Sequence, residues 1–187
     1  MAVQPLTVDT FWQQYANKPY ELIRGRAVRI PFKNPLGVLI LSCVTRELGS
    51  YIEQHDLGQL MLNVGFALTP RTLYGVDLAY ISNANLQRAT QEKDYVPFAP
   101  DLMVKVVSDR ERAQEVQDRV TTFLDGGSAY VWLIYARSGQ VIIYDKQQVA
   151  RTFSLRETLN GGDVLPGFEV PVSKLFPSEV LDISEGN

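Results

Sequence analysis

The chain has 187 residues, of which 45% are hydrophobic and 21% are charged. This length and composition are typical of one globular domain and exclude a disordered or fibrous chain. A single cysteine, Cys43, excludes an intramolecular disulfide and is consistent with a reducing compartment. No signal peptide and no apolar run long enough to span a membrane are evident. We therefore predict one domain over residues 1–187, located in the cytoplasm.

The net charge is −3, from 18 basic and 21 acidic residues, so the overall charge does not support nucleic-acid binding. The distribution of charge is more informative. The segment from Lys18 to Lys33 contains five basic residues and a single acidic one, Glu21. Such a segment is either the solvated surface of a hairpin or a face that meets a phosphate backbone.

The hydrophobic pattern predicts an α/β protein with one mixed sheet and helices. In chain order we predict a helix at 7–16, strands at 20–23 and 27–30, a helix at 36–52, strands at 60–68 and 73–82, a loop or short helix at 83–98, a strand at 102–107, a helix beginning at Ser108, strands at 130–135, 140–145 and 149–153, a helical turn at 154–159 and an ordered tail to residue 176. The helix start at Ser108 is predicted because Ser108 and Glu111 form a capping-box pattern.

Two charged residues interrupt otherwise apolar strands. They are Asp77, in the segment 73–82, and Lys105, in the segment 102–107. A charged side chain in an apolar strand is costly unless it is paired or faces a cleft. Two interpretations follow: the residues form an ion pair across neighbouring strands, or both project into one shared pocket on the sheet. No standard phosphate-loop, nucleophile-elbow or paired-cysteine motif accompanies them.

Five short motifs follow one another along the chain. They are Tyr20-Glu21-Leu22-Ile23 with Gly25, then Val76-Asp77-Leu78-Ala79-Tyr80, the segments 99–108 and 127–132, and the closing segment 165–172. In this order, and with the predicted elements, they resemble a large bacterial family of restriction-endonuclease-like proteins, long catalogued as a domain of unknown function. The resemblance covers residues 7–176. It implies the PD-(D/E)xK nuclease fold, an α/β (α+β) architecture with a mixed central sheet flanked by helices and an N-terminal hairpin extension.

The resemblance also implies a function, the metal-dependent hydrolysis of phosphodiester bonds in DNA. In such nucleases acidic side chains on adjacent strands hold a divalent ion, usually Mg²⁺, which lowers the pKa of a bound water, and a lysine assists. Asp77 matches the aspartate of the family. The glutamate expected in the core strand is replaced by Lys105, and the lysine expected in the following helix is replaced by Arg119. Around the Gly25 turn, basic residues stand where an acidic one is usual.

The residues implied for the site are therefore Asp77 and Glu21 as metal ligands, with Asp77, Lys105 and Arg119 as catalytic residues. Replacing a carboxylate by an ammonium group changes the charge of the site by two units. Against a dication about 4 Å away, each unit is worth roughly 8 kcal/mol at an effective dielectric constant near 20. Lys105 therefore repels the ion that this site should hold. Arg119 either binds phosphate bidentately or is a surface residue paired with Glu115.

Three functions remain open from the sequence. The first is a metal-dependent DNA endonuclease with an altered site. The second is a degenerate nuclease that binds nucleic acid or a protein partner without cutting, in which Lys105, Arg119, Arg24 and Arg26 form an anion cleft. The third is a non-catalytic oligomerising module. Because proteins with this fold often dimerise, a homodimer is expected, and the aromatic residues of the segment 130–135 are candidates for its interface.

Overall fold

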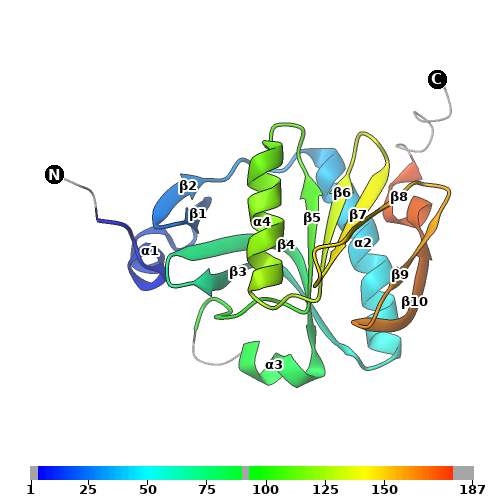
Figure 1. Ribbon diagram of the computed structural model, residues 1–187, viewed down its shortest axis with the longest axis horizontal. Coiled ribbons are helices and arrows are strands. Elements are labelled where there is room, and N and C mark those ends of the chain that lie inside the picture. The colour runs from blue at the N-terminus through cyan, green and yellow to red at the C-terminus, as the bar shows by residue number, and fades with distance from the viewer. Residues whose placement is uncertain (1–3, 90–92, 179–187) are drawn as a thin grey trace.

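The computed structural model describes residues 4–89 and 93–178. Figure 1 shows the arrangement of its elements. In chain order these are α1 (Val8–Tyr15), β1 (Tyr20–Ile23), β2 (Arg26–Arg29), α2 (Pro35–Gln54), β3 (Gly58–Thr69), β4 (Thr72–Ser82), α3 (Asn83–Ala89), β5 (Leu102–Val107), α4 (Ala113–Asp125), β6 (Tyr130–Tyr135), β7 (Gln140–Asp145), β8 (Ala150–Phe153), β9 (Thr158–Gly161), β10 (Leu165–Pro171) and the short 3-10 helix Val172–Leu175.

Within the described residues, eight strands form one mixed sheet. Seven of them follow the order β2-β1-β4-β5-β6-β7-β8, and β3 pairs with β4 outside this path. Strands β5 and β6 are parallel, with α4 as their crossover, whereas the other paired strands are antiparallel. The N-terminal hairpin joins the sheet because Leu22 of β1 pairs with Leu73 of β4. The predicted mixed sheet with an N-terminal hairpin is thus confirmed.

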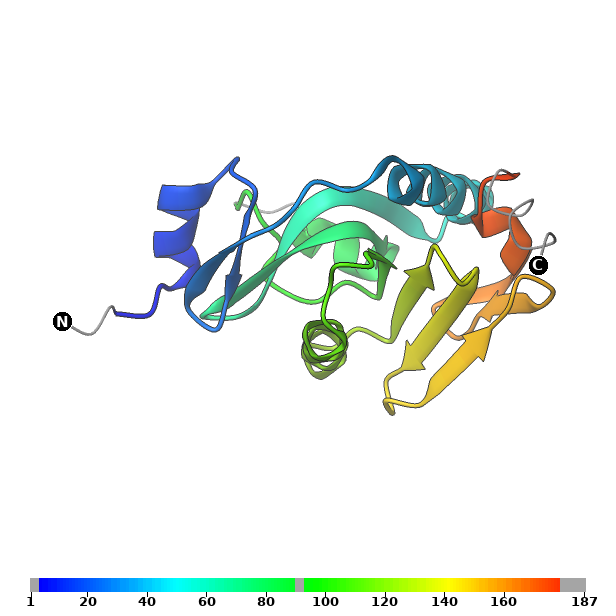
Figure 2. The ribbon, with the colours of Figure 1, turned by 90° about the horizontal axis from the view of Figure 1, so that it is seen from above.

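Helices cover both faces of the sheet. Figure 2 shows α2 on one side of it and α4 on the other. Helix α2 buries residues such as Ile40, Val44 and Leu48 against one face, and α4 buries Val120 and Phe123 against the other. These residues recur every three or four positions, which aligns them along one side of each helix. The central strand β5 is therefore apolar on both faces, as its short hydrophobic run predicts.

Two predicted helix starts are wrong for the same reason. No helix begins at Ser108, because α4 begins at Ala113, and the segment predicted as a helical turn at 154–159 leads into strand β9. One of the two bonds of a capping box nevertheless forms in each case: the backbone N–H of Ser108 donates to Glu111 at 2.9 Å, and that of Ser154 donates to Glu157 at 2.7 Å. A serine–glutamate pair stabilises a single turn, and a helix grows from it only when an apolar face follows.

The aromatic residues predicted as an interface lie mainly inside the molecule. The Trp132 side chain is 1% exposed and belongs to the main core, while Tyr130 and Tyr135 are half-buried. The prediction is wrong for Trp132 because β6 is a central strand, paired with β5 and β7 and covered on both faces. Its ring therefore contributes to the core of this domain rather than to a contact surface.

Candidate functional site

A cleft of about 740 Å³ opens at the point where the hairpin, strands β4 and β5 and helix α4 meet. Glu21, Asp77, Lys105 and Arg119 all line it. The structure thus brings together the four residues that the sequence singles out, and the expectation of one shared pocket for Asp77 and Lys105 is confirmed. The catalytic and metal-binding roles assigned to these four residues stay predictions.

The cleft exists because one edge of β4 is only partly paired. Its first edge runs alongside β3 over nearly its whole length. Its second edge pairs with β1 at Leu73 and with β5 from Leu78 to Tyr80. The backbone of residues 74–77 has no strand partner on this second edge, and its polar groups need other hydrogen-bonding partners.

Glu21 and Arg119 supply partners for this free edge. The backbone N–H of Gly75 donates to Glu21 Oε1 at 2.9 Å, and Arg119 Nη1 donates to the carbonyl oxygen of Gly75 at 3.2 Å. The two side chains also bind each other through a bidentate pair at 2.9 and 2.7 Å. Their exposed fractions are only 4% for Glu21 and 11% for Arg119. This buried pair connects β1, β4 and α4 at the wall of the cleft.

Arg119 is not the surface residue paired with Glu115 that one interpretation predicts. Its guanidinium carbon lies 4.2 Å from the centre of the Tyr74 ring, in a cation–π contact. Burial lowers the pKa of Arg119, but the charge and hydrogen bonds of Glu21 outweigh burial and raise it. The guanidinium group therefore stays charged. The surface prediction fails because position 119 lies on the side of α4 that faces the sheet.

Asp77 stands at the point where β4 and β5 separate. The last paired residues before it are Leu78 and Val104, so Asp77 and Lys105 would be the next pair in this register. Instead the Asp77 carboxylate accepts a hydrogen bond from the backbone N–H of Val106 at 3.2 Å and forms an ion pair with Lys33. The predicted Asp77–Lys105 ion pair is therefore wrong.

Lys105 has a different partner, Glu111. Its Nζ lies 2.7 Å from Glu111 Oε1, and both side chains are largely buried. The other carboxylate oxygen of Glu111 accepts the backbone N–H of Ser108. Lys33 and Glu111 are thus two site residues that the sequence analysis does not identify. The sequence contains a basic segment that ends at Lys33 and a serine–glutamate pattern that includes Glu111. Neither pattern shows that Lys33 would pair with Asp77 or that Glu111 would pair with Lys105.

A strained residue marks the same place on the neighbouring strand. Asn63 in β3 has a φ of 54°. It lies opposite Asp77 of β4, but these two residues are not paired, although the residues on either side of them are. A left-handed residue in the middle of a strand is uncommon and locally distorts the pairing. On β4, Val76 packs in the cluster under α4 whereas Leu78 packs in the cluster under α2, although they have the same strand parity. The strand thus turns over at Asp77, on the wall of the cleft.

These side chains do not fit a resident divalent ion as they are arranged. Glu21 accepts three hydrogen bonds, Asp77 is engaged by Lys33, and Lys105 stands where the resemblance implies an acid. In residues 4–89 and 93–178, no group of three His, Cys, Asp or Glu side chains could hold a metal. Over the same residues, no buried side-chain nitrogen or oxygen lacks a hydrogen-bond partner. The implied Mg²⁺ therefore has no ready ligand set in this part of the chain.

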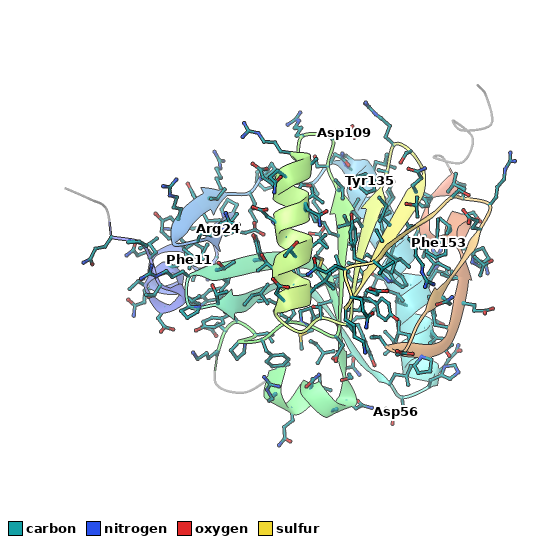
Figure 3. All side chains as sticks on the ribbon, in the orientation of Figure 1. Phe11, Arg24, Asp56, Asp109, Tyr135 and Phe153 are labelled. Atoms are coloured by element: carbon teal, nitrogen blue, oxygen red, sulfur yellow. The ribbon has the colours of Figure 1, made fainter. Side chains whose placement is uncertain are left out.

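Formal charges balance inside the cleft but not at its rim. Among the described residues that line it, four are acidic and four are basic. The nearby hairpin adds the exposed side chains of Arg24, Arg26 and Arg29, of which Arg24 forms an exposed ion pair with Asp118. Figure 3 labels Arg24 on this hairpin and Asp109 in the loop that leads into α4. The surface beside the cleft is thus richer in cations than the cleft itself.

The mixed sheet, the flanking helices and the cleft at the separated strands define a nuclease-like fold. A solved structure described as a "putative nuclease" of a domain-of-unknown-function family, from Anabaena variabilis, superposes with a TM-score of 0.82 and covers 94% of this chain and 99% of its own, at 18% identity. The sequence itself matches the model of the Uma2 family, described as "Putative restriction endonuclease", over residues 8–173. The chain belongs to this family. No curated protein matches it.

The family membership confirms the resemblance found in the sequence. It does not identify the ions, partners or assembly of this chain, so Mg²⁺, DNA, the homodimer and the cytoplasmic location stay predictions. In the described part of the chain, no helix combines the length and apolarity needed to cross a bilayer.

Proposed function

We propose that this protein binds the phosphodiester backbone of DNA beside and within this cleft, and that its ion pairs have taken the place of metal-dependent cleavage. The observation that carries the proposal is the Lys105–Glu111 pair, which puts a cation where the sequence resemblance implies a metal-binding acid. Two further pairs, Glu21–Arg119 and Asp77–Lys33, engage the two carboxylates that were expected to bind the metal. The three carboxylates of these pairs are therefore not free to bind a metal.

The cations beside the cleft support binding of a phosphate backbone. Arg26 and Arg29 lie on β2, the edge strand of the sheet, with their side chains exposed. Lys33 and Arg110 line the cleft next to them. The whole chain has a net charge of −3, so these residues form a local positive patch on an acidic protein. Such a patch attracts and orients a polyanion.

DNA binding that depends on salt but not on metal is the expected result. If four phosphates are contacted, the dissociation constant measured by fluorescence anisotropy should rise roughly 100-fold between 50 and 200 mM salt. It should not change when EDTA is added. The double variant Arg26→Glu/Arg29→Glu should bind more weakly and reduce the slope of log Kd against log salt by about 2.

A matched control is the double variant Arg151→Glu/Arg156→Glu, which changes the charge by the same amount at exposed positions in β8 and in the connection between β8 and β9. This variant should retain the affinity of the unmodified protein. Binding that is absent, or that is indifferent to salt, would contradict the proposal.

Metal-dependent cleavage is the second candidate function, because Glu21, Asp77 and Lys105 line one cleft. Under the proposal above, the protein should leave supercoiled plasmid DNA intact in both Mg²⁺ and Mn²⁺. Nicking that requires either ion, and that the isosteric variant Asp77→Asn abolishes, would establish the second candidate instead. Circular dichroism of the variant should first show that it is folded.

A further inference from the structure

Phe32 is the most exposed large hydrophobic side chain in the described part of the chain. Its exposed fraction is 91%, whereas the other exposed side chains of this kind range from 41% to 51%. Phe32 also lines the cleft, together with its neighbours Pro31 and Lys33. An aromatic ring that is left almost entirely in water at the edge of a binding cleft is available to a ligand.

The backbone on both sides of Phe32 is anchored. On one side, the N–H of Ile30 donates to the carbonyl oxygen of Pro19 at 2.9 Å. On the other side, Asn34 caps helix α2 by accepting the N–H of Gly37 at 2.7 Å. Between these anchors Pro31 restricts the backbone, and the adjacent Lys33 is held by its ion pair with Asp77. The segment that carries the ring is thus already ordered in the folded protein, so little conformational entropy would be lost from it on binding a ligand.

The charges around the ring indicate which partner it suits. Arg29, Lys33 and Arg110 lie along the same segment or line the same cleft. A cationic surface beside an exposed aromatic ring is the combination that binds single-stranded nucleic acid, because the cations follow the backbone and the ring stacks on a base. A second copy of this chain, docked through the same patch, would bring its own cations against these and be repelled.

We propose that Phe32 is a stacking platform for an unpaired base, so that the cleft prefers single-stranded DNA, or a strand end, to continuous duplex. The inference rests on the proposed function and specifies its substrate class. In a continuous duplex the bases are already stacked on one another, and one of them would have to leave the stack to reach the ring.

The test compares a fluorescein-labelled 20-nucleotide single strand with the matching duplex in anisotropy titrations. The unmodified protein should bind the single strand more tightly. Phe32→Ala should weaken single-strand binding about tenfold and leave duplex binding and the salt slope unchanged, whereas Phe32→Trp should restore it. Because the ring makes so little contact with the protein, Phe32→Ala should unfold at the same temperature as the unmodified chain.

Val38→Ala is the control for the loss of an exposed apolar side chain, because Val38 is half-exposed but does not line the cleft. It should bind as the unmodified protein does. If neither DNA form binds, the proposed function fails and this inference fails with it. If both forms bind but Phe32→Ala has no effect, only the inference is overturned. A dimer that Phe32→Ala converts to a monomer in light scattering would overturn it as well.

Discussion

Replacing Arg119 by methionine is expected to lower the free energy of unfolding by about 3–5 kcal/mol. Methionine keeps an apolar, unbranched chain in place of the arginine stem and removes the guanidinium group, so the loss arises mainly from charge. Without the guanidinium group, the Glu21 carboxylate stays 4% exposed and loses two of its three hydrogen bonds. The carbonyl oxygen of Gly75 loses its side-chain donor as well. Urea denaturation followed by circular dichroism measures the change.

Two further variants separate the charge from other causes. Adding Glu21→Gln to Arg119→Met removes the uncompensated charge and should recover more than half of the lost stability. Arg24→Met breaks the exposed pair with Asp118 and should change the free energy of unfolding by less than about 1 kcal/mol. A loss below about 1 kcal/mol for Arg119→Met would show that the buried pair does not hold this wall of the cleft.

The Lys105→Glu variant is expected to create a metal requirement that the unmodified protein lacks. The change removes the partner of Glu111 and places a further carboxylate beside Asp77 and Glu111 in the cleft. In EDTA, the repulsion should destabilise the fold by about 2–3 kcal/mol, which corresponds to a fall of roughly 5–10 °C in Tm. At a Mn²⁺ concentration 100 times its dissociation constant, binding should return about 2.7 kcal/mol.

Thermal unfolding with and without Mn²⁺ measures this effect independently of cleavage. Lys105→Gln is the matched control, because it removes the ion pair without adding an acid, and its Tm should not respond to Mn²⁺. The unmodified protein should not respond either. A rise in its Tm with Mn²⁺ would show that a divalent-ion site already exists despite Lys105. An absence of response in Lys105→Glu would show that the other acids are held too far apart to share an ion.

The three ion pairs of the cleft share one physical origin. Each charged side chain that lines the gap between β1 and β5 lies in partly buried surroundings, where an unpaired charge is costly. The pairing is made by residues from the connection to α2, the loop before α4 and α4 itself, rather than by the strands alone. Altering one partner therefore affects the stability of the whole cleft as well as its ligands.

Most of the secondary structure follows from local patterns. The alternation of apolar residues in β3 and the apolar face of α2 predict those elements closely, because each pattern matches the geometry of one element. The wrong helix start at Ser108 comes from a motif that forms a local hydrogen bond without helix growth, and a bond of the same kind forms at Ser154. A local hydrogen bond can be predicted from the sequence, but the burial of an apolar helix face, which allows the helix to extend, cannot be predicted from the motif alone.

The sequence by itself determined the class of fold, the presence of costly charges at Asp77 and Lys105, and the family to which the chain belongs. Only the tertiary structure decided which charges meet: Asp77 with Lys33, Lys105 with Glu111, and Glu21 with Arg119. The reason is that the sequence pattern of a strand specifies the face of the sheet on which a side chain lies. The ionic partner of that side chain depends instead on where the pairing of β4 with β1 ends and its pairing with β5 begins. That gap arises from contacts between residues that are distant in the chain.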